Sequence, residues 1–442
     1  MYKIIMLSTI IVIIIFGNLT AQTGIESLSL QQALNLCEQN NLTIQQHEQR
    51  IRQAMAELSV QKSNYFPTLK VNAGYNYISE IAEYEISLPM PGLAPINMQA
   101  GATNQYDLNA TLRQPIFTGF RTRNLVKSAN ETIRQTEYQK ISVENRIRLQ
   151  IHQIFYTAQL NQLQQQVLQS ALKRTQQHLQ SVTNFYQAGQ ATAFVTMKIA
   201  NQTLEIQTQL VRLIHSEKII LSQLAQILNI KGIPTVESFS AKNISLLLQP
   251  IEILQEEALQ HRPELSQLKH RVMAQRYRKN AVRSALFPQV FANASYHYAR
   301  PGVNFFRDEW MDYYSIGVNL QWELWNWKRT GNKVKQADYA IRILSLEDDK
   351  FLESVRQEVI QAYENLLSDK EQIALTRQLV EQGNERYRIT REKFGRGLAT
   401  SIDLSDAENA LTAAELKLQQ NYINWMRNKA QLKYATGNIG VK

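Results

Sequence analysis

The residue types that most often carry out catalysis are present in this sequence without the spacing that catalysis needs. The seven histidines are scattered, and none forms a His-x-x-x-His pair beside an acid, a common metal-binding arrangement. His261 and His270 fit solvated positions on a polar helix face. The only cysteine, Cys37, has no evident base, and no glycine-rich phosphate loop follows a strand. We therefore predict no enzyme activity, no cofactor and no metal site.

The net charge of +10 raises the question of a nucleic-acid partner. The basic residues are spread among many Gln and Glu along polar helix faces, with no Lys/Arg block interleaved with aromatic residues. This distribution is typical of a solvated surface, and we expect no nucleic-acid partner.

The N-terminal residues indicate export. Lys3 precedes a mostly apolar run over residues 4–16, and the small residue Ala21 follows. This pattern predicts a secretory signal peptide over residues 1–21. An N-terminal anchor helix is the alternative, but the run is shorter than the roughly 20 residues that span a bilayer. Cys37 lies beyond the cleavage site, so neither a lipid-anchored cysteine nor an internal disulfide is expected. No later segment is apolar for long enough to be a transmembrane helix.

The sequence is internally duplicated, which is the strongest sign of its organisation. Residues 66–77 match residues 287–298 at an offset of 221. Further along the offset becomes 208, so that Gly189 pairs with Gly397 and Leu224 with Leu432. We expect a first repeat over residues 22–231, a linker over 232–250 that contains helix-breaking residues, and a second repeat over 251–442.

Each repeat contains a very long helical stretch. No Gly or Pro lies between Gly119 and Gly189, and none lies within residues 332–382. Ile147, Ile151, Ile154 and Ala158 follow the spacing of helices packed side by side, and their repeat partners are also apolar. About 65 helical residues would reach about 100 Å, far more than a compact domain needs. A second helix runs back in each repeat, and a shorter helix precedes each strand region.

Two β-hairpins are predicted, over residues 68–117 and 289–325, from four segments with period-two alternation. A transmembrane strand takes roughly 9–11 residues with alternating lipid and lumen faces, and all four segments fit this pattern. Trp322, Trp325 and Trp327 fit an aromatic girdle at a barrel end better than a binding cleft. An ordinary amphipathic sheet on a soluble core is the alternative. Four strands cannot close a barrel, because about eight is the practical minimum, so a barrel would require an oligomer.

Several phrases at the turns carry a family resemblance. They are Phe66-Pro67 and Phe287-Pro288 at strand entry, residues 115–121 after the second strand, residues 397–404 at a helix turn, and Arg262-Pro263-Glu264-Leu265 at a helix start. In their order and duplication they resemble the TolC family of outer membrane efflux proteins over nearly the whole mature chain. The resemblance implies a mainly α-helical chain that contributes four strands to a trimeric 12-stranded transmembrane barrel, continued by an α-helical tunnel through the periplasm.

The same resemblance implies a function. The chain would be the outer-membrane channel of a tripartite efflux system, a passive duct for small molecules that meets a periplasmic adaptor protein and an inner-membrane pump. The loops at residues 79–104 and 300–312 would face outside. The outer-membrane component of a type I protein secretion system is an alternative in the same structural class. A soluble periplasmic coiled-coil scaffold is an alternative from a different class.

The resemblance also implies site residues at the periplasmic tip. Asp403 and Asp406 match the aspartates that constrict the pore in the family, and their spacing puts them on one helix face. Thr400 followed by Asp403 is also a helix-capping pattern, and the two roles are compatible. Val195 is the first-repeat partner of Asp403, so any gate would be asymmetric. The candidates for adaptor contact are Gly189, Thr192, Gly397, Leu398 and Thr400. Phe394 and Ala399 stand where some relatives have a tyrosine and an arginine that lock the tip, which departs from the family pattern.

Overall fold

The structure is a computed structural model that describes residues 27–86, 92, 95–241 and 246–440. The signal peptide proposed for residues 1–21 lies outside the described residues, as do residues 242–245 of the linker. The chain divides into two compact units. Unit 1 contains the described residues within 1–40, 151–245 and 372–424, and unit 2 contains those within 41–150, 246–371 and 425–442. Each unit therefore takes segments from both sequence repeats.

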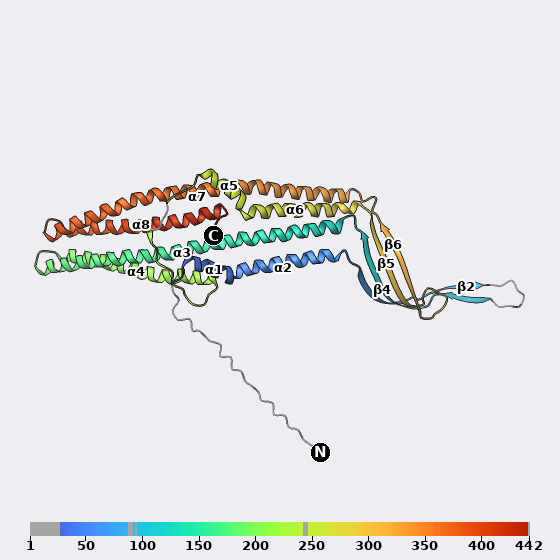
Figure 1. Ribbon diagram of the computed structural model, residues 1–442. Coiled ribbons are helices and arrows are strands. Elements are labelled where there is room, and N and C mark those ends of the chain that lie inside the picture. Colours follow the sequence, from blue (N-terminus) through green and yellow to red (C-terminus); the bar gives the residue numbers. More distant parts are fainter. Residues whose placement is uncertain (1–26, 87–91, 93–94, 242–245, 441–442) are drawn as a thin grey trace, which may run out of the picture. The chain divides into compact units, whose positions relative to one another are not determined.

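Unit 1 is helical. It contains α1 (Leu30–Asn40) and α4 (Ala193–Leu228), together with parts of α3 (Arg121–Gln187), α7 (Arg329–Gly395) and α8 (Ser401–Ala435) (Figure 1). One apolar cluster joins α3 to α4 through Leu168, Ala171, Ile206 and Leu210. α4 ends where Asn229 adopts a left-handed conformation, as is common at helix C-termini.

The two longest helices, α3 and α7, contain 67 residues each. α7 continues without a break through Gly331 and Gly383, two residues that weaken a helix but do not end it. The structure buries the apolar seam residues Ile147, Ile151 and Ala158 of α3 and their partners Val355, Val359 and Leu366 of α7. Ala362 is also buried, whereas its partner Ile154 is half-buried. None of the described helices has both the length and the hydropathy to cross a membrane.

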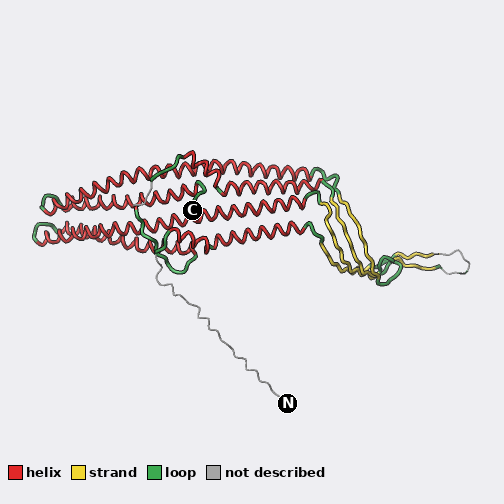
Figure 2. Tube along the Cα trace, in the orientation of Figure 1, coloured by secondary structure: helices red, strands yellow, loops and turns green. Residues whose placement is uncertain are grey.

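Unit 2 contains an antiparallel sheet of four strands in the order β1-β4-β5-β6. They are β1 (Thr68–Tyr77), β4 (Asn104–Phe117), β5 (Gln289–Arg300) and β6 (Met311–Gln321). β4 and β5 come from different repeats and pair directly, so the sheet joins the two predicted hairpins. Figure 2 shows helices of this unit meeting one end of the strands.

Two features of the strand region differ from the sequence-based expectation. The second hairpin ends at Gln321 instead of residue 325. The stretch assigned as an outer loop contains a separate two-stranded sheet of β2 (Ala82–Ile86) and β3 (Ile96–Ala100). Five-residue strands are too short for their alternation to stand out in a sequence.

The four-stranded sheet has one apolar and one polar face, as the alternation predicted. On β6 the apolar face carries Tyr314, Ile316, Val318 and Leu320, and the first two are 77% and 78% exposed. The polar face is connected by hydrogen bonds between side chains of neighbouring strands. Asn72 donates to Asn109 at 2.9 Å, and the Thr111 and Ser295 hydroxyls lie 3.0 Å apart. An exposed apolar face of this size requires a further partner.

The connection from β4 to α3 in the first repeat and the connection from β6 to α7 in the second repeat have matching backbone conformations. Gly119 and Phe120 have φ angles of 60° and 67°, and their repeat partners Trp327 and Lys328 have 50° and 61°. At Gly119 a side chain has no room, because a Cβ would lie 2.5 Å from the Ser284 main-chain oxygen. Trp327 adopts the same left-handed conformation with its side chain 82% exposed.

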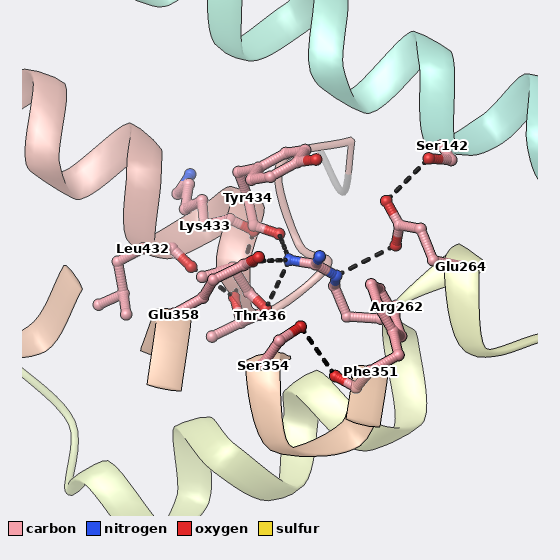
Figure 3. Close-up of polar contacts among 11 residues, drawn as sticks. Ser142, Arg262, Glu264, Phe351, Ser354, Glu358, Leu432, Lys433, Tyr434 and Thr436 are labelled. Carbon is pink, nitrogen blue, oxygen red and sulfur yellow. Dashed lines mark hydrogen bonds and ion pairs between the residues drawn. The ribbon is translucent and has the colours of Figure 1, made fainter. Parts of the chain in front are cut away.

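Arg262 is the centre of a polar junction between α6 (Pro263–Arg283), α7 and the end of α8 (Figure 3). It follows α5 (Ile251–His261) and is 4% exposed. Its guanidinium donates to Glu264 at 3.1 Å and to Glu358 at 2.8 Å. It also donates to the main-chain oxygens of Tyr434 and Ala435, where the last carbonyls of α8 attract positive charge. Glu264 in turn accepts from the Ser142 hydroxyl of α3.

α2 (Leu42–Ser63), which leads into β1, begins at a side-chain cap. The Asn41 side-chain oxygen accepts hydrogen bonds from the main-chain N–H groups of Thr43 and Ile44, at 2.9 and 3.2 Å. These bonds satisfy two of the amides that a helix start leaves without partners.

Candidate functional site

The tip residues proposed from the sequence lie in two turns of unit 1, between α3 and α4 and between α7 and α8. In the first turn Gly189 N–H donates to Tyr186 O and Gln190 N–H donates to Phe185 O, at 2.9 and 2.8 Å. In the second turn Gly397 N–H donates to Phe394 O and Leu398 N–H to Lys393 O, at 3.0 and 2.8 Å. Both helices therefore end in a Schellman motif, and the duplication extends to individual hydrogen bonds.

The backbone conformation of these turns requires glycine at positions 189 and 397. Gly189 and Gly397 have φ angles of 73° and 75°, the left-handed region that L side chains rarely adopt. A Cβ at either position would meet nothing within 4 Å, so space is not the constraint. The adjoining Leu398 is 74% exposed. The turns thus present their side chains outward.

α8 begins with a capping box. Thr400 N–H and the Thr400 hydroxyl both donate to the Asp403 carboxylate, at 2.9 and 2.7 Å. Asp403 N–H donates back to the Thr400 hydroxyl oxygen at 3.1 Å. These hydrogen bonds from Thr400 hold the pKa of Asp403 below its usual range, so the carboxylate stays ionised. The structure therefore assigns Asp403 the capping role that the sequence pattern predicted.

Asp406 lies one turn further along α8, and both aspartates are exposed. Val195, the first-repeat partner of Asp403, is instead partly buried against the apolar cluster of Val182, Ile199, Phe394 and Leu404. The two repeats therefore differ at this position, one presenting a carboxylate and the other an apolar side chain. The assignment of Asp403 and Asp406 to a pore constriction remains a prediction.

Phe394 is buried in the apolar cluster between the two turns. It packs with Val182, Ile199 and Leu404, and its ring lies edge-on to Phe185 with centroids 5.6 Å apart. A groove of about 390 Å³ adjoins this cluster. Thr192, Gly397 and Thr400, three of the proposed adaptor-contact residues, are among its lining residues. A buried apolar contact thus stands at a position where some members of the family have a polar lock, in line with the departure noted from the sequence.

His178 forms a buried polar contact that the sequence did not suggest. Its Nδ1 lies 3.2 Å from a carboxylate oxygen of Glu408, and the two side chains are 1% and 3% exposed. Its Nε2 lies 2.8 Å from the Ser401 hydroxyl, and its ring packs edge-on against Phe394. Ser401 and Glu408 lie seven residues apart on one face of α8. This spacing is the only local pattern in the sequence that relates the two partners of His178.

A second polar contact lies close by along the same two helices. The Arg174 guanidinium donates to Glu415 at 2.9 Å and to the Thr412 hydroxyl at 3.0 Å. Because Arg174 and His178 are four residues apart on α3, both contacts use one helix face. Polar pairs of α3 and α8 therefore fix the register of helices that come from different repeats.

The geometry described so far defines a class of protein: a duplicated chain in which each repeat contributes a pair of long helices and two strands of a sheet with an exposed apolar face. Its fold is that of solved outer-membrane channels. The outer-membrane channel OprN has a TM-score of 0.77 at 15% identity, covering 92% of this chain and 90% of that chain. VceC of Vibrio cholerae has a TM-score of 0.74 at 16% identity, covering 92% and 96%. At these identities the likeness establishes the fold alone.

The family is established by sequence. The family model described as outer membrane efflux protein matches residues 33–229 and 254–438. The chain belongs to this family and is an outer-membrane efflux channel, which confirms the predicted family, function and location. TtgC of Pseudomonas putida, a probable efflux pump outer membrane protein, is 20% identical over 78% of this chain and 72% of its own length. AprF of Pseudomonas aeruginosa, an alkaline protease secretion protein, is 25% identical over 41% of this chain and 37% of its own length.

Proposed function

We propose that three copies of this chain close a 12-stranded barrel in the outer membrane and form a passive exit duct. The observation that supports this most directly is the pair of free edges of the four-stranded sheet. β1 and β6 each pair with one neighbour among the described strands. Four strands are too few to close, whereas joining β6 of one copy to β1 of the next removes every edge.

The exposed apolar face supports a lipid partner for this sheet. The alternation of apolar residues continues in the sequence to Trp322 and Leu324, beyond the end of β6. Trp325 and Trp327 follow, with ring centroids 5.7 Å apart. Tryptophan is enriched where a membrane meets water, because its ring is apolar and its N–H is polar. We assign these tryptophans to the girdle at the periplasmic end of the barrel.

In this arrangement the long helices form a tunnel, and the turns at Gly189 and Gly397 form its periplasmic tip. A periplasmic adaptor protein would dock at these turns, through Gly189, Thr192, Gly397, Leu398 and Thr400. An inner-membrane pump would supply the energy, because the chain itself would be passive. The exposed side chains at the turns and the adjoining groove support a docking role.

The cargo class has two candidates. The likeness to TtgC and ArpC of Pseudomonas putida favours a duct for small molecules, since those relatives' names refer to efflux of toluene and of antibiotics. The likeness to AprF favours the outer component of a protein-secretion system, since that relative's name refers to secretion of a protease. We propose small-molecule efflux as the function, because the TtgC match covers more of both chains.

The barrel can be tested with two neighbouring residues of β6. Ile316 lies on the apolar face and Ser315 on the polar face, opposite Ser295. A lysine facing lipid near the bilayer midplane costs about 2–4 kcal/mol, whereas a lumen position tolerates charge. We expect the wild-type protein and Ser315→Lys to fractionate with the outer membrane and to have the size of a trimer in mild detergent. Ile316→Lys should neither reach the outer membrane nor form trimers. A soluble monomer for the wild type, or equal assembly of both variants, would overturn the proposal.

A further inference from the structure

The polar face of the sheet carries two cationic side chains near the strand ends that join the helices. They are Lys70 on β1 and Arg113 on β4, both exposed. In the register of the two strands Lys70 lies opposite Thr111, and Arg113 lies opposite Thr68. Since residues two apart on a strand share a face, Lys70 and Arg113 are diagonal neighbours on one face.

That face is the one connected by polar hydrogen bonds. Thr111, opposite Lys70, contacts the Ser295 hydroxyl at 3.0 Å. Two residues further along, the Asn72 and Asn109 side chains hydrogen-bond. In the proposed barrel this face lines the lumen, because the opposite face is apolar.

Neither cation is neutralised within the described part of the sheet, where no ion pair joins Lys70 or Arg113 to a carboxylate. Within the four strands the carboxylate on this face is Asp107, which lies four residues from Thr111 along β4, about 13 Å. Glu323, two residues beyond the end of β6, is paired with Arg329. It accepts hydrogen bonds from His297 at 3.0 Å and from Asn109. The helix-side end of the face is therefore positively charged.

The Arg113 guanidinium is held in place by an aromatic ring. Its central carbon lies 4.0 Å from the centroid of the Phe291 ring on β5. A cation–π contact positions the guanidinium across the face and leaves its charge intact. Its charge is consequently presented at a fixed position on the strand face.

The cations are a property of the first repeat. The repeat partner of Lys70 is Phe291, at the offset of 221, and the partner of Arg113 is Gln321, at the offset of 208. Neither partner is charged, although both stand at corresponding positions of their strands. The duplication thus supplies matched positions at which charge can be removed or added.

We propose that Lys70 and Arg113 form a basic girdle in the barrel lumen that gives the duct a preference for anionic solutes carrying carboxylate, sulfonate or phosphate groups. The inference rests on the proposed function, because three copies bring six cations to the helix-side end of the barrel, within two residues of one another along the strands. Rings of Lys and Arg select anions in pores as carboxylate rings select cations. Asp403 and Asp406 would impose the opposite preference at the tip.

The ion selectivity of channels in planar bilayers tests whether the girdle attracts anions. In a KCl gradient near 0.1 M, where the Debye length is about 10 Å, we expect Lys70→Gln and Arg113→Gln each to shift the zero-current potential towards cation selectivity. Gln321→Arg adds a positive charge at the repeat partner of Arg113, and it should shift the zero-current potential towards anion selectivity. All three shifts should shrink near 1 M salt, where the Debye length is about 3 Å.

Lys218→Gln is the matched control, since it removes the same charge from an exposed position of α4 outside the sheet. It should leave the potential unchanged. Arg113→Gln also loses the contact with Phe291, so Lys70→Gln provides the cleaner test. Inorganic pyrophosphate serves as an anionic probe, and its block of the current should weaken in Lys70→Gln.

Two failures can be told apart. Channels whose selectivity and pyrophosphate block are unaffected by Lys70→Gln, Arg113→Gln and Gln321→Arg would overturn the girdle and leave the duct standing. A wild-type protein that forms no channels would overturn the proposed duct, and the girdle with it.

Discussion

The imidazole of His178 on α3 and the carboxylate of Glu408 on α8 lie 3.2 Å apart with almost no solvent exposure. The two residues are 230 positions apart in sequence and come from different repeats. The Ser401 hydroxyl satisfies the other ring nitrogen, so His178 has a partner on each side. A buried polar pair of this kind specifies how two helices are aligned, because a shifted register would leave both groups without hydrogen bonds.

This contact predicts a non-additive effect of mutation. His178→Leu should destabilise the protein by about 1–3 kcal/mol, because it leaves the Glu408 carboxylate buried without its partner. His178→Leu combined with Glu408→Leu should recover part of that loss, since both polar groups are then gone. Thermal unfolding of the detergent-extracted wild type, of both single variants and of the double variant measures these losses of stability. Losses in the double variant that equal the sum of the single losses would contradict the coupling.

The tip aspartates predict a change in conduction. Asp403→Ala combined with Asp406→Ala should raise single-channel conductance and weaken block by divalent cations, because rings of carboxylates bind cations at a constriction. Single-channel recording in planar bilayers measures both quantities. Glu205→Ala, at an exposed position of α4, is the control for loss of a carboxylate. Unchanged conductance and block in the double variant would remove the two aspartates from the constriction.

The capping box predicts a pH-dependent loss of order at the start of α8. The pKa of Asp403 is lowered in the folded protein by hydrogen bonds from Thr400. Its stabilising effect is therefore fully present above the unperturbed aspartate pKa of about 3.9 and is lost as pH falls through the folded value. Asp403→Ala should speed hydrogen exchange in the first turn of α8 at neutral pH.

The difference from wild type should disappear in strong acid, once Asp403 is protonated in both states. Asp406→Ala is the control, because Asp406 lies beyond the capping box and should leave exchange in the first turn unchanged. Equal exchange in wild type and Asp403→Ala at neutral pH would show that the cap does not hold this turn.

The junction at Arg262 predicts a large effect from one buried cation. Arg262→Met should cost about 3 kcal/mol, because Glu358, Glu264 and the last carbonyls of α8 lose their donor while the aliphatic stem is retained. Arg271→Met is the matched control in the same unit. Arg271 pairs with Glu347 at 3.0 Å with both side chains nearly half exposed, and such pairs contribute about 0–1 kcal/mol. Similar melting temperatures for the two variants would contradict the junction's role.

Much of this protein is determined by local patterns in its sequence. Period-two alternation defined the four long strands, because every second side chain on a strand faces the same way. The spacing of Thr400 and Asp403 defined the cap of α8, because a capping box needs only residues three apart. The duplicated glycines at 189 and 397 marked the turns for a similar reason, since the left-handed conformation is set by the residue itself.

Only the tertiary structure decided which distant side chains meet. The pairing of His178 with Glu408 and the convergence of Glu358 and Ala435 on Arg262 depend on helix rotation and register, which no local pattern fixes. The environment of Phe394 was also decided by tertiary structure. The sequence showed only that it departs from the lock residue of some relatives, and packing buries it beside Phe185 and His178. Local patterns are set by backbone geometry within a few residues, whereas these contacts are set by how long helices align along their whole length.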